Sequence, residues 1–202
     1  MIKFMISIFV LVVCICCPLQ ADAFLLIDTG VASDLDAGPP LFVQWLAVEF
    51  DLNQAFTITS IESAFRNTRD VVGNLALSIY QDGGDVPDVS SLIYSDVFNV
   101  TSSLDQEFGW YGLHGLSLNL SPGQYWAAFE VNQNHTYRGV ALQGAAPLDN
   151  EAFGFNGFWS PQDNINLALR VHAERPGGRP IPEPATWMLV SLGMGMIYYR
   201  RR

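Results

Sequence analysis

Hydrophobic and polar residues alternate along most of the middle of the chain, and stretches with helical periodicity are scarce. In residues 45–52, Leu46, Val48 and Phe50 fall on one face, whereas Asp51 falls on the other. Alternation with a period of two is typical of half-buried antiparallel strands. The same alternation predicts strands over residues 75–80, 116–120 and 165–172. We expect others over residues 24–28, 56–65, 92–100, 124–131 and 138–142.

Turn-forming residues separate these predicted strands. They include Asp82-Gly83-Gly84-Asp85, Ser121-Pro122-Gly123 and Asn156-Gly157. Glycine supplies the backbone angles that tight turns need, and proline ends regular pairing. Many short strands with turns between them indicate an all-β fold, an antiparallel β-sandwich of jelly-roll type, over residues 24–174.

The first residues carry the pattern of a secretory signal peptide. Lys3 supplies a positive charge, residues 4–17 are apolar, and Ala21-Asp22-Ala23 offers small residues for cleavage, so we expect a signal peptide at 1–23. A lipoprotein signal is the alternative, but none of Cys14, Cys16 and Cys17 follows a small residue. Cleavage after Ala23 would leave a mature chain without cysteine, and therefore without disulfides or a Cys-ligated metal.

The C-terminal residues form three segments in a fixed order. A Pro/Gly-rich linker at 175–181 leads to Pro182-Glu183-Pro184, then to an uncharged apolar stretch at 185–199, and finally to Arg200, Arg201 and Arg202. An apolar stretch beside arginines predicts a transmembrane helix with the arginines on the cytoplasmic side. A helix of this length is short against a hydrocarbon core of about 30 Å, so it would span a locally thinned bilayer.

This tail resembles the PEP-CTERM sorting signal, which exosortases recognise in exopolysaccharide-producing Gram-negative bacteria. The resemblance implies the sorting motif at 182–202, an exosortase as partner, export through the inner membrane, transient anchoring in the membrane, and a final place at the cell surface or in the extracellular matrix. An ordinary single-pass tail anchor is the alternative. Residues 77–87 and 120–126 also resemble parts of secreted β-sandwich domains that precede such signals, which supports the fold and the compartment alone.

Charge excludes one class of partner. Residues 24–179 contain six arginines and eighteen acidic residues, which gives a formal net charge of −12. Nucleic acid is therefore not expected as a partner, because phosphate binding needs a basic surface. An acidic surface suits a secreted protein, or one that binds neutral sugars or divalent cations.

The chain shows no recognised catalytic motif, and we do not expect an enzyme. Glu49 with Glu130 could form a glycosidase pair, and Asp105, Glu107 and His114 a catalytic group, but nothing in the spacing favours either. The three histidines are scattered along the sequence, which argues against a zinc site.

Two groups of residues are candidates for binding. Asp82, Asp85 and Asp88 surround a glycine-containing turn that could hold a structural Ca²⁺, although a solvated turn is the alternative. No other cofactor is expected.

The second candidate group is aromatic. Trp110 and Tyr111 lie between glycines, and Trp159 follows a glycine-rich segment. We interpret these segments as loops, where exposed rings could stack on sugars, although core packing is the alternative. Trp45 and Trp126 lie within predicted strands, and we expect them to be structural.

Three classes of function remain open. The first is an exported surface or matrix protein with a structural or interaction role, and the second is a module that binds extracellular polysaccharide. The third is a hydrolase on the same scaffold. The sorting signal is compatible with all three, because it concerns location and not activity.

Overall fold

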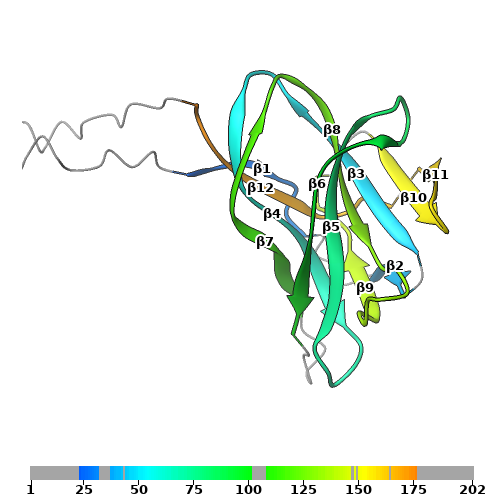
Figure 1. Ribbon diagram of the computed structural model, residues 1–202. Coiled ribbons are helices and arrows are strands. Elements are labelled where there is room, and N and C mark those ends of the chain that lie inside the picture. The colour runs from blue at the N-terminus through cyan, green and yellow to red at the C-terminus, as the bar shows by residue number, and fades with distance from the viewer. Residues whose placement is uncertain are drawn as a thin grey trace, which may run out of the picture. The chain divides into compact units, whose positions relative to one another are not determined.

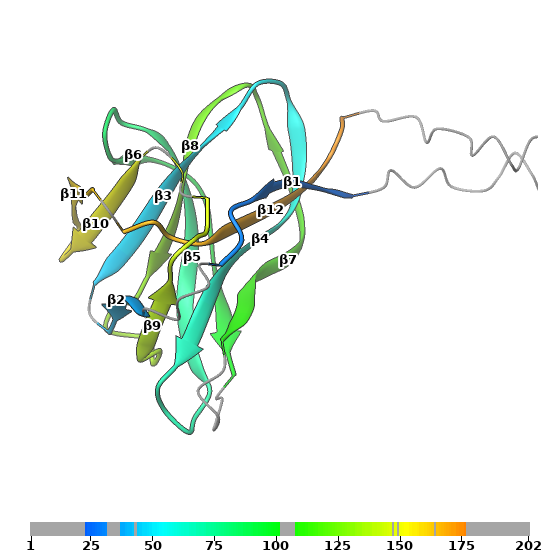
Figure 2. The ribbon, with the colours of Figure 1, turned by 180° about the vertical axis from the view of Figure 1, so that it is seen from behind.

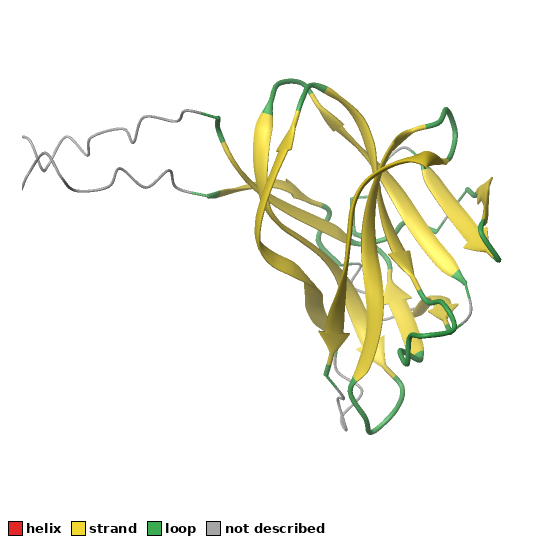
Figure 3. Cartoon of the chain, in the orientation of Figure 1, coloured by secondary structure: helices red, strands yellow, loops and turns green. Residues whose placement is uncertain are grey.

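The computed structural model describes residues 23–31, 37–42, 44–101, 108–146, 148, 150–163 and 165–176. These residues form strands, turns and loops without a helix (Figure 3). Within this part of the chain there is accordingly no helix that could cross a membrane. The predicted signal peptide before Ala23, the sorting motif, the helix at 185–199 and the final arginines lie outside the described residues.

The first sheet has the order β1-β12-β4-β9-β2, and β7 pairs with the opposite edge of β4 (Figure 1). β4 is the central strand, since Phe65 faces Gly109 of β7 on one side and Ala141 of β9 on the other. The strands of this sheet are β1 (Phe24–Asp28), β2 (Ala37–Leu41), β4 (Phe56–Asn67), β7 (Gly109–Leu120), β9 (Gly139–Leu142) and β12 (Leu169–Glu174).

The second sheet has the order β11-β10-β3-β8-β5-β6, and all its neighbouring strands are antiparallel (Figure 2). Its strands are β3 (Trp45–Leu52), β5 (Gly73–Asp82), β6 (Pro87–Val100), β8 (Gly123–Glu130), β10 (Glu151–Phe155) and β11 (Phe158–Pro161).

Aromatic rings join the two sheets in the core. The ring of Phe65 in β4 lies 5.9 Å from that of Phe98 in β6 and 5.3 Å from that of Phe129 in β8. It also lies 5.6 Å from the ring of Tyr137, which is fully buried. These contacts between facing sheets confirm the predicted antiparallel β-sandwich. The chain changes sheet at most of its connections, as expected for a sandwich of jelly-roll type.

The last predicted strand is wrong in its first half. Residues 165–168 alternate as a strand would, but only Leu167 forms a bridge, to Gln143, and regular pairing begins at Leu169. Asn166 has a φ of 52°, which breaks the extended conformation. The carboxylate of Glu151 accepts a hydrogen bond from the Leu167 N–H at 2.6 Å and holds this irregular segment in place.

Three strands were not predicted from the alternation pattern. β2 contains Pro39 and Pro40, which are tolerated because β2 lies at an edge of the sheet. β10 and β11 form a hairpin whose turn, at Asn156 and Gly157, was predicted. Both turn residues have positive φ values, 50° and 85°, as a two-residue hairpin turn of type I′ requires.

Candidate functional site

The structure does not bring the three predicted sugar-binding residues together. Trp110 and Tyr111 lie in β7 of the first sheet, where they pair with Ala64 and Ser63 of β4. Trp159 lies in β11 of the second sheet. The prediction that these rings stand on loops is therefore wrong.

The glycines beside these rings allow close packing and do not form the loops that the sequence had suggested. A Cβ on Gly112 would lie 1.9 Å from the carbonyl oxygen of Ile61, so this glycine allows β7 to approach β4 closely. A Cβ on Gly154 would lie 2.9 Å from the ring of Trp159, its cross-strand partner. Both glycines mark close packing within sheets.

The predicted sugar-binding rings take part in packing. The guanidinium of Arg170 lies 3.8 Å from the centre of the Trp110 ring, and Arg170 also donates a hydrogen bond to Asp28 at 3.1 Å. This bond lowers the pKa of Asp28, although partial burial acts in the opposite direction. The Tyr111 hydroxyl lies 2.8 Å from that of Thr101.

Trp126 has the structural role that was predicted for it. Its side chain is fully buried on the outer face of the second sheet, and its indole N–H donates to Asp82 at 2.9 Å. Trp45 is only half-buried, and its ring lies 5.6 Å from that of Trp159.

The acidic residues of the predicted calcium loop are engaged in local hydrogen bonds. Asp82 accepts from the N–H of Gly84, and Asp88 accepts from the hydroxyl groups of Ser90 and Ser91. The two hydroxyl bonds lower the pKa of Asp88. The described residues contain no group of three His, Cys, Asp or Glu side chains arranged to hold a metal ion. Calcium binding by Asp82, Asp85 and Asp88 stays a prediction.

Glu130 belongs to a buried polar network on the outer face of the second sheet. Its carboxylate accepts hydrogen bonds from the Tyr80 hydroxyl at 2.7 Å and from the Ser78 hydroxyl at 3.2 Å. Burial raises the pKa of Glu130, and these two bonds only partly oppose the effect. Burial and the neighbouring Glu130 raise the pKa of Tyr80.

Two of the histidines that are scattered in the sequence meet in space. His114 of β7 and His172 of β12 lie on either side of Glu62 in β4, with nitrogen to oxygen distances of 3.6 and 3.8 Å. His135 is instead buried, and its Nδ1 lies 3.0 Å from the carbonyl oxygen of Glu130. The register of β7 and β12 against β4 brings His114 and His172 together, and this register is not visible in the sequence.

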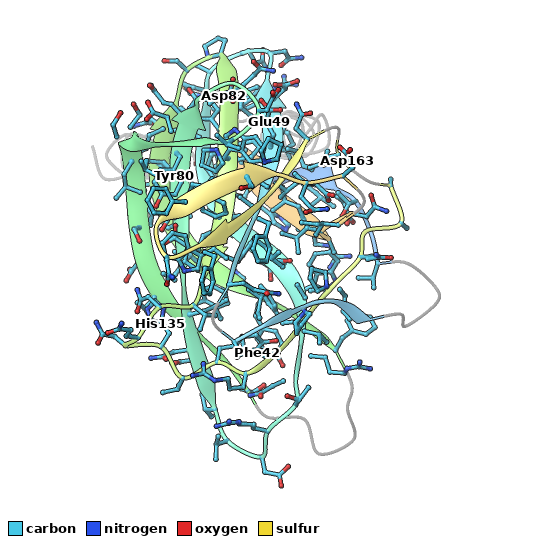
Figure 4. All side chains as sticks on the ribbon, turned by 90° about the vertical axis from the view of Figure 1, so that its right-hand side faces the viewer. Phe42, Glu49, Tyr80, Asp82, His135 and Asp163 are labelled. Carbon is cyan, nitrogen blue, oxygen red and sulfur yellow. The ribbon has the colours of Figure 1, made fainter. Side chains whose placement is uncertain are left out.

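An open groove of about 760 Å³ lies at the end of the sandwich where the β10–β11 turn meets the segment after β8. In Figure 4, Phe42 and His135 mark this end, whereas Glu49, Tyr80 and Asp82 lie toward the opposite end. The groove is lined by Phe42, Trp45, Val131, Asn132, Gln133, Asn134, Arg138, Phe155, Asn156 and Gly157.

Aromatic rings form the apolar part of the groove. Phe42 and Phe155 are 45% and 46% exposed, although large apolar side chains are usually buried. The indole N–H of Trp45 donates to the Val131 carbonyl at 3.2 Å, which fixes the orientation of this ring. Sequence reasoning expected Trp45 to be structural and did not single out Phe42, because each ring lies at or just beyond the end of a strand.

Amide side chains form the polar part, and local hydrogen bonds shape the segment that carries them. The side-chain oxygen of Asn132 accepts from the N–H of Asn134 at 3.0 Å. Further along, the side-chain oxygen of Asn74 accepts from the N–H and the hydroxyl of Thr136. Rings that can stack on C–H groups, beside amides that bond hydroxyl groups, suit a carbohydrate ligand.

A smaller polar cavity of about 410 Å³ lies beside β10. Asp85, Glu151 and Asp163 contribute acidic side chains to its lining. Burial raises the pKa of Glu151, and hydrogen bonds from the backbone of residues 165–167 partly oppose this. Glu151 is thus committed to holding its neighbouring segment.

Comparison with known families identifies the C-terminal residues. Residues 180–202 match the family model of the PEP-CTERM protein-sorting motif. The chain carries a PEP-CTERM sorting signal. The match includes Pro182-Glu183-Pro184 and the final arginines, as the sequence predicts. The PEP-CTERM signal indicates an exported protein that an exosortase sorts to the cell envelope. No curated protein matches the chain.

Proposed function

We propose that this PEP-CTERM protein acts at the surface or in the extracellular matrix of a Gram-negative bacterium, by binding and not by catalysis. The sorting signal supports handling by an exosortase, with residues 185–199 as a transient membrane anchor. An exported protein of this kind meets the polysaccharides that surround the cell.

We infer that the sandwich domain binds such a polysaccharide in the groove at its end. The observation that carries this proposal is the combination of three rings, Phe42, Trp45 and Phe155, with four amide side chains in one open groove. Its volume falls within the range of about 300–1,000 Å³ that is typical of small-ligand sites. A groove open to solvent can also admit a sugar unit from within a longer chain.

A hydrolase on this scaffold receives less support. Glu49 and Glu130, the glycosidase pair considered from the sequence, are both buried and do not line the groove. The carboxylate oxygens of Glu130 accept bonds from Tyr80 and Ser78. Binding without catalysis therefore fits the described residues better.

Retention on immobilised exopolysaccharide tests this proposal. The protein is isolated from an exosortase-bearing strain, and Phe155→Ala is compared with Phe108→Ala, which removes an exposed ring outside the groove. We expect roughly tenfold weaker binding for Phe155→Ala, because one stacking contact is lost, and native binding for Phe108→Ala. Equal binding by the native protein and Phe155→Ala would exclude the groove as the site.

A further inference from the structure

We propose that the groove selects anionic polysaccharides, and that the guanidinium of Arg138 binds the carboxylate of a uronic acid unit. This inference rests on the proposed function, because it specifies the class of sugar that the groove accepts.

The charge of the groove differs from that of the rest of the protein. The chain has twenty acidic residues against ten lysines and arginines. Among the described residues that line the groove there is nevertheless no aspartate or glutamate, and Arg138 is the one permanently charged side chain. A site for neutral sugars does not need a positive charge on an acidic protein. An anionic sugar, by contrast, would be repelled by the acidic surface elsewhere.

Arg138 has no acidic partner among the described residues. The close contacts between basic and acidic side chains in this part of the chain are those of Arg170 with Asp28 and of two histidines with Glu62, and none involves Arg138. Arg170, by contrast, binds the carboxylate of Asp28 and lies over the Trp110 ring. No acidic side chain in this part of the chain therefore neutralises Arg138.

The hydrogen bonds of the guanidinium lead to the same conclusion. A guanidinium has five N–H donors, and with the described residues that of Arg138 makes one bond, from Nη1 to the Tyr137 carbonyl at 2.7 Å. That bond orients the group and leaves further donors for a carboxylate.

The backbone around Arg138 is held firmly. The Arg138 carbonyl accepts from the N–H and the hydroxyl of Thr68, at 3.1 and 2.9 Å. Tyr137 beside it is fully buried, and its hydroxyl lies 3.1 Å from the carbonyl oxygen of Arg66. A backbone that is held in place before binding loses little conformational freedom when the ligand arrives.

A uronic acid unit matches these features together. Its ring presents C–H groups to aromatic side chains and hydroxyl groups to amides, and its carboxylate can accept two parallel bonds from an arginine. Arginine suits this planar geometry better than lysine does.

Paired polymers test the inference. The native protein, isolated as above, is titrated with polygalacturonate and with the same polymer after reduction of its carboxyl groups. Arg138→Gln removes the charge, and Arg138→Lys keeps the charge without the planar group. Arg175→Gln is the matched control, because it makes the same charge change outside the groove lining. Thermal unfolding checks that each variant is folded.

We expect the native protein to prefer the uronate polymer. Arg138→Gln should lose roughly ten- to hundredfold in affinity for it, with little change for the reduced polymer, because a charge-assisted bond is lost. Arg138→Lys should lie between the two, and Arg175→Gln should match the native protein. Added salt should weaken the binding of the uronate polymer alone.

Two results would overturn the inference, and only one of them would also count against the proposed function. Equal affinity of the native protein for both polymers would refute selection by charge and leave polysaccharide binding in place. Binding of neither polymer would refute the inference, and an accompanying lack of retention on exopolysaccharide would refute the proposed function as well.

Discussion

Buried carboxylates are the residues whose chemistry depends most on this fold. Glu130 and Glu151 are each at least nine-tenths buried, and burial raises the pKa of both side chains. Each accepts hydrogen bonds from groups that would otherwise be unsatisfied inside the protein. Their ionisation should therefore affect stability.

The free energy of unfolding should fall as pH rises from 4.5, the ordinary value for glutamate, through the raised pKa of Glu130. In this window the native state binds more protons than the unfolded state does, so removal of protons favours unfolding. Glu130→Gln cannot ionise, and its stability relative to the native protein should increase with pH. Urea denaturation at several pH values measures this. Parallel curves for the two proteins would contradict it.

Asp28 and Asp88 affect stability in a different pH range from that of Glu130. Their pKa values are lowered from 3.8, so the stability they contribute is lost only as pH falls below that value. Measurements well above pH 4.5 thus leave out the titration of these two aspartates.

The packing of Trp159 gives a second prediction at this scale. Its ring lies against Trp45 and over Gly154, so Trp159→Ala should reduce the free energy of unfolding by about 2 kcal/mol. Trp126→Ala, at a fully buried position, should cost about 3–5 kcal/mol. Chemical denaturation measures both values. An unchanged stability for Trp159→Ala would show a ring free for ligands, as the sequence suggested.

The elements show which parts of the fold are predictable from sequence. Alternation predicts β3 well, because Leu46, Val48 and Phe50 on one face meet the main core, although the other face is largely buried too. It fails at residues 165–168, where a buried carboxylate distant in sequence shapes the backbone. It also fails at β7, where Gly109 and Gly112 suggest a loop although they permit close packing within the sheet.

The same distinction explains the candidate site. The turn at Asn156 and Gly157 is visible in the sequence, since few residues accept its backbone angles. The groove is not, because its rings and amides come from segments that are separated by many residues and carry no common motif. Only the register of the strands brings them to one end.

The hairpin turn offers a prediction at the element scale. Gly157 has a φ of 85°, so Gly157→Ala should cost about 1–2 kcal/mol of stability. Gly157→Asn should cost less, because asparagine tolerates this region. Because Gly157 also lines the groove, the alanine variant should bind exopolysaccharide more weakly. Thermal unfolding and retention assays measure the two effects. Equal stability of both variants would argue against backbone strain at this turn.

At the scale of the whole molecule, the sorting signal and the sandwich have separate tasks. The tail was identifiable from sequence because its three segments are contiguous, so no folding is needed to assemble them. The sandwich is acidic and thiol-free after the expected cleavage, which suits an exported protein.

Replacement of Glu183 tests the task of the tail. Glu183→Ala should leave a full-length, membrane-bound precursor, whereas the native chain should lose residues 185–202. Glu174→Ala, outside the matched residues, is the control and should be processed normally. Mass spectrometry of the C-terminus in an exosortase-bearing strain measures the outcome. Identical C-termini for Glu183→Ala and native chains would exclude recognition of this glutamate.

The placement of the chain ends relative to the groove has a mechanical consequence. β1 and β12 are antiparallel neighbours, so the two ends of the described domain lie side by side, whereas the β10–β11 hairpin lies on the far side in both Figures 1 and 2. A molecule held at β12 and gripping a polymer in the groove would carry tension through the whole sandwich. That tension would reach β4 through the backbone hydrogen bonds between β12 and β4, which pair residues 169–174 with residues 57–63. Many hydrogen bonds would bear this force at once. The domain would therefore resist it better than a force that separates the neighbouring ends of β1 and β12.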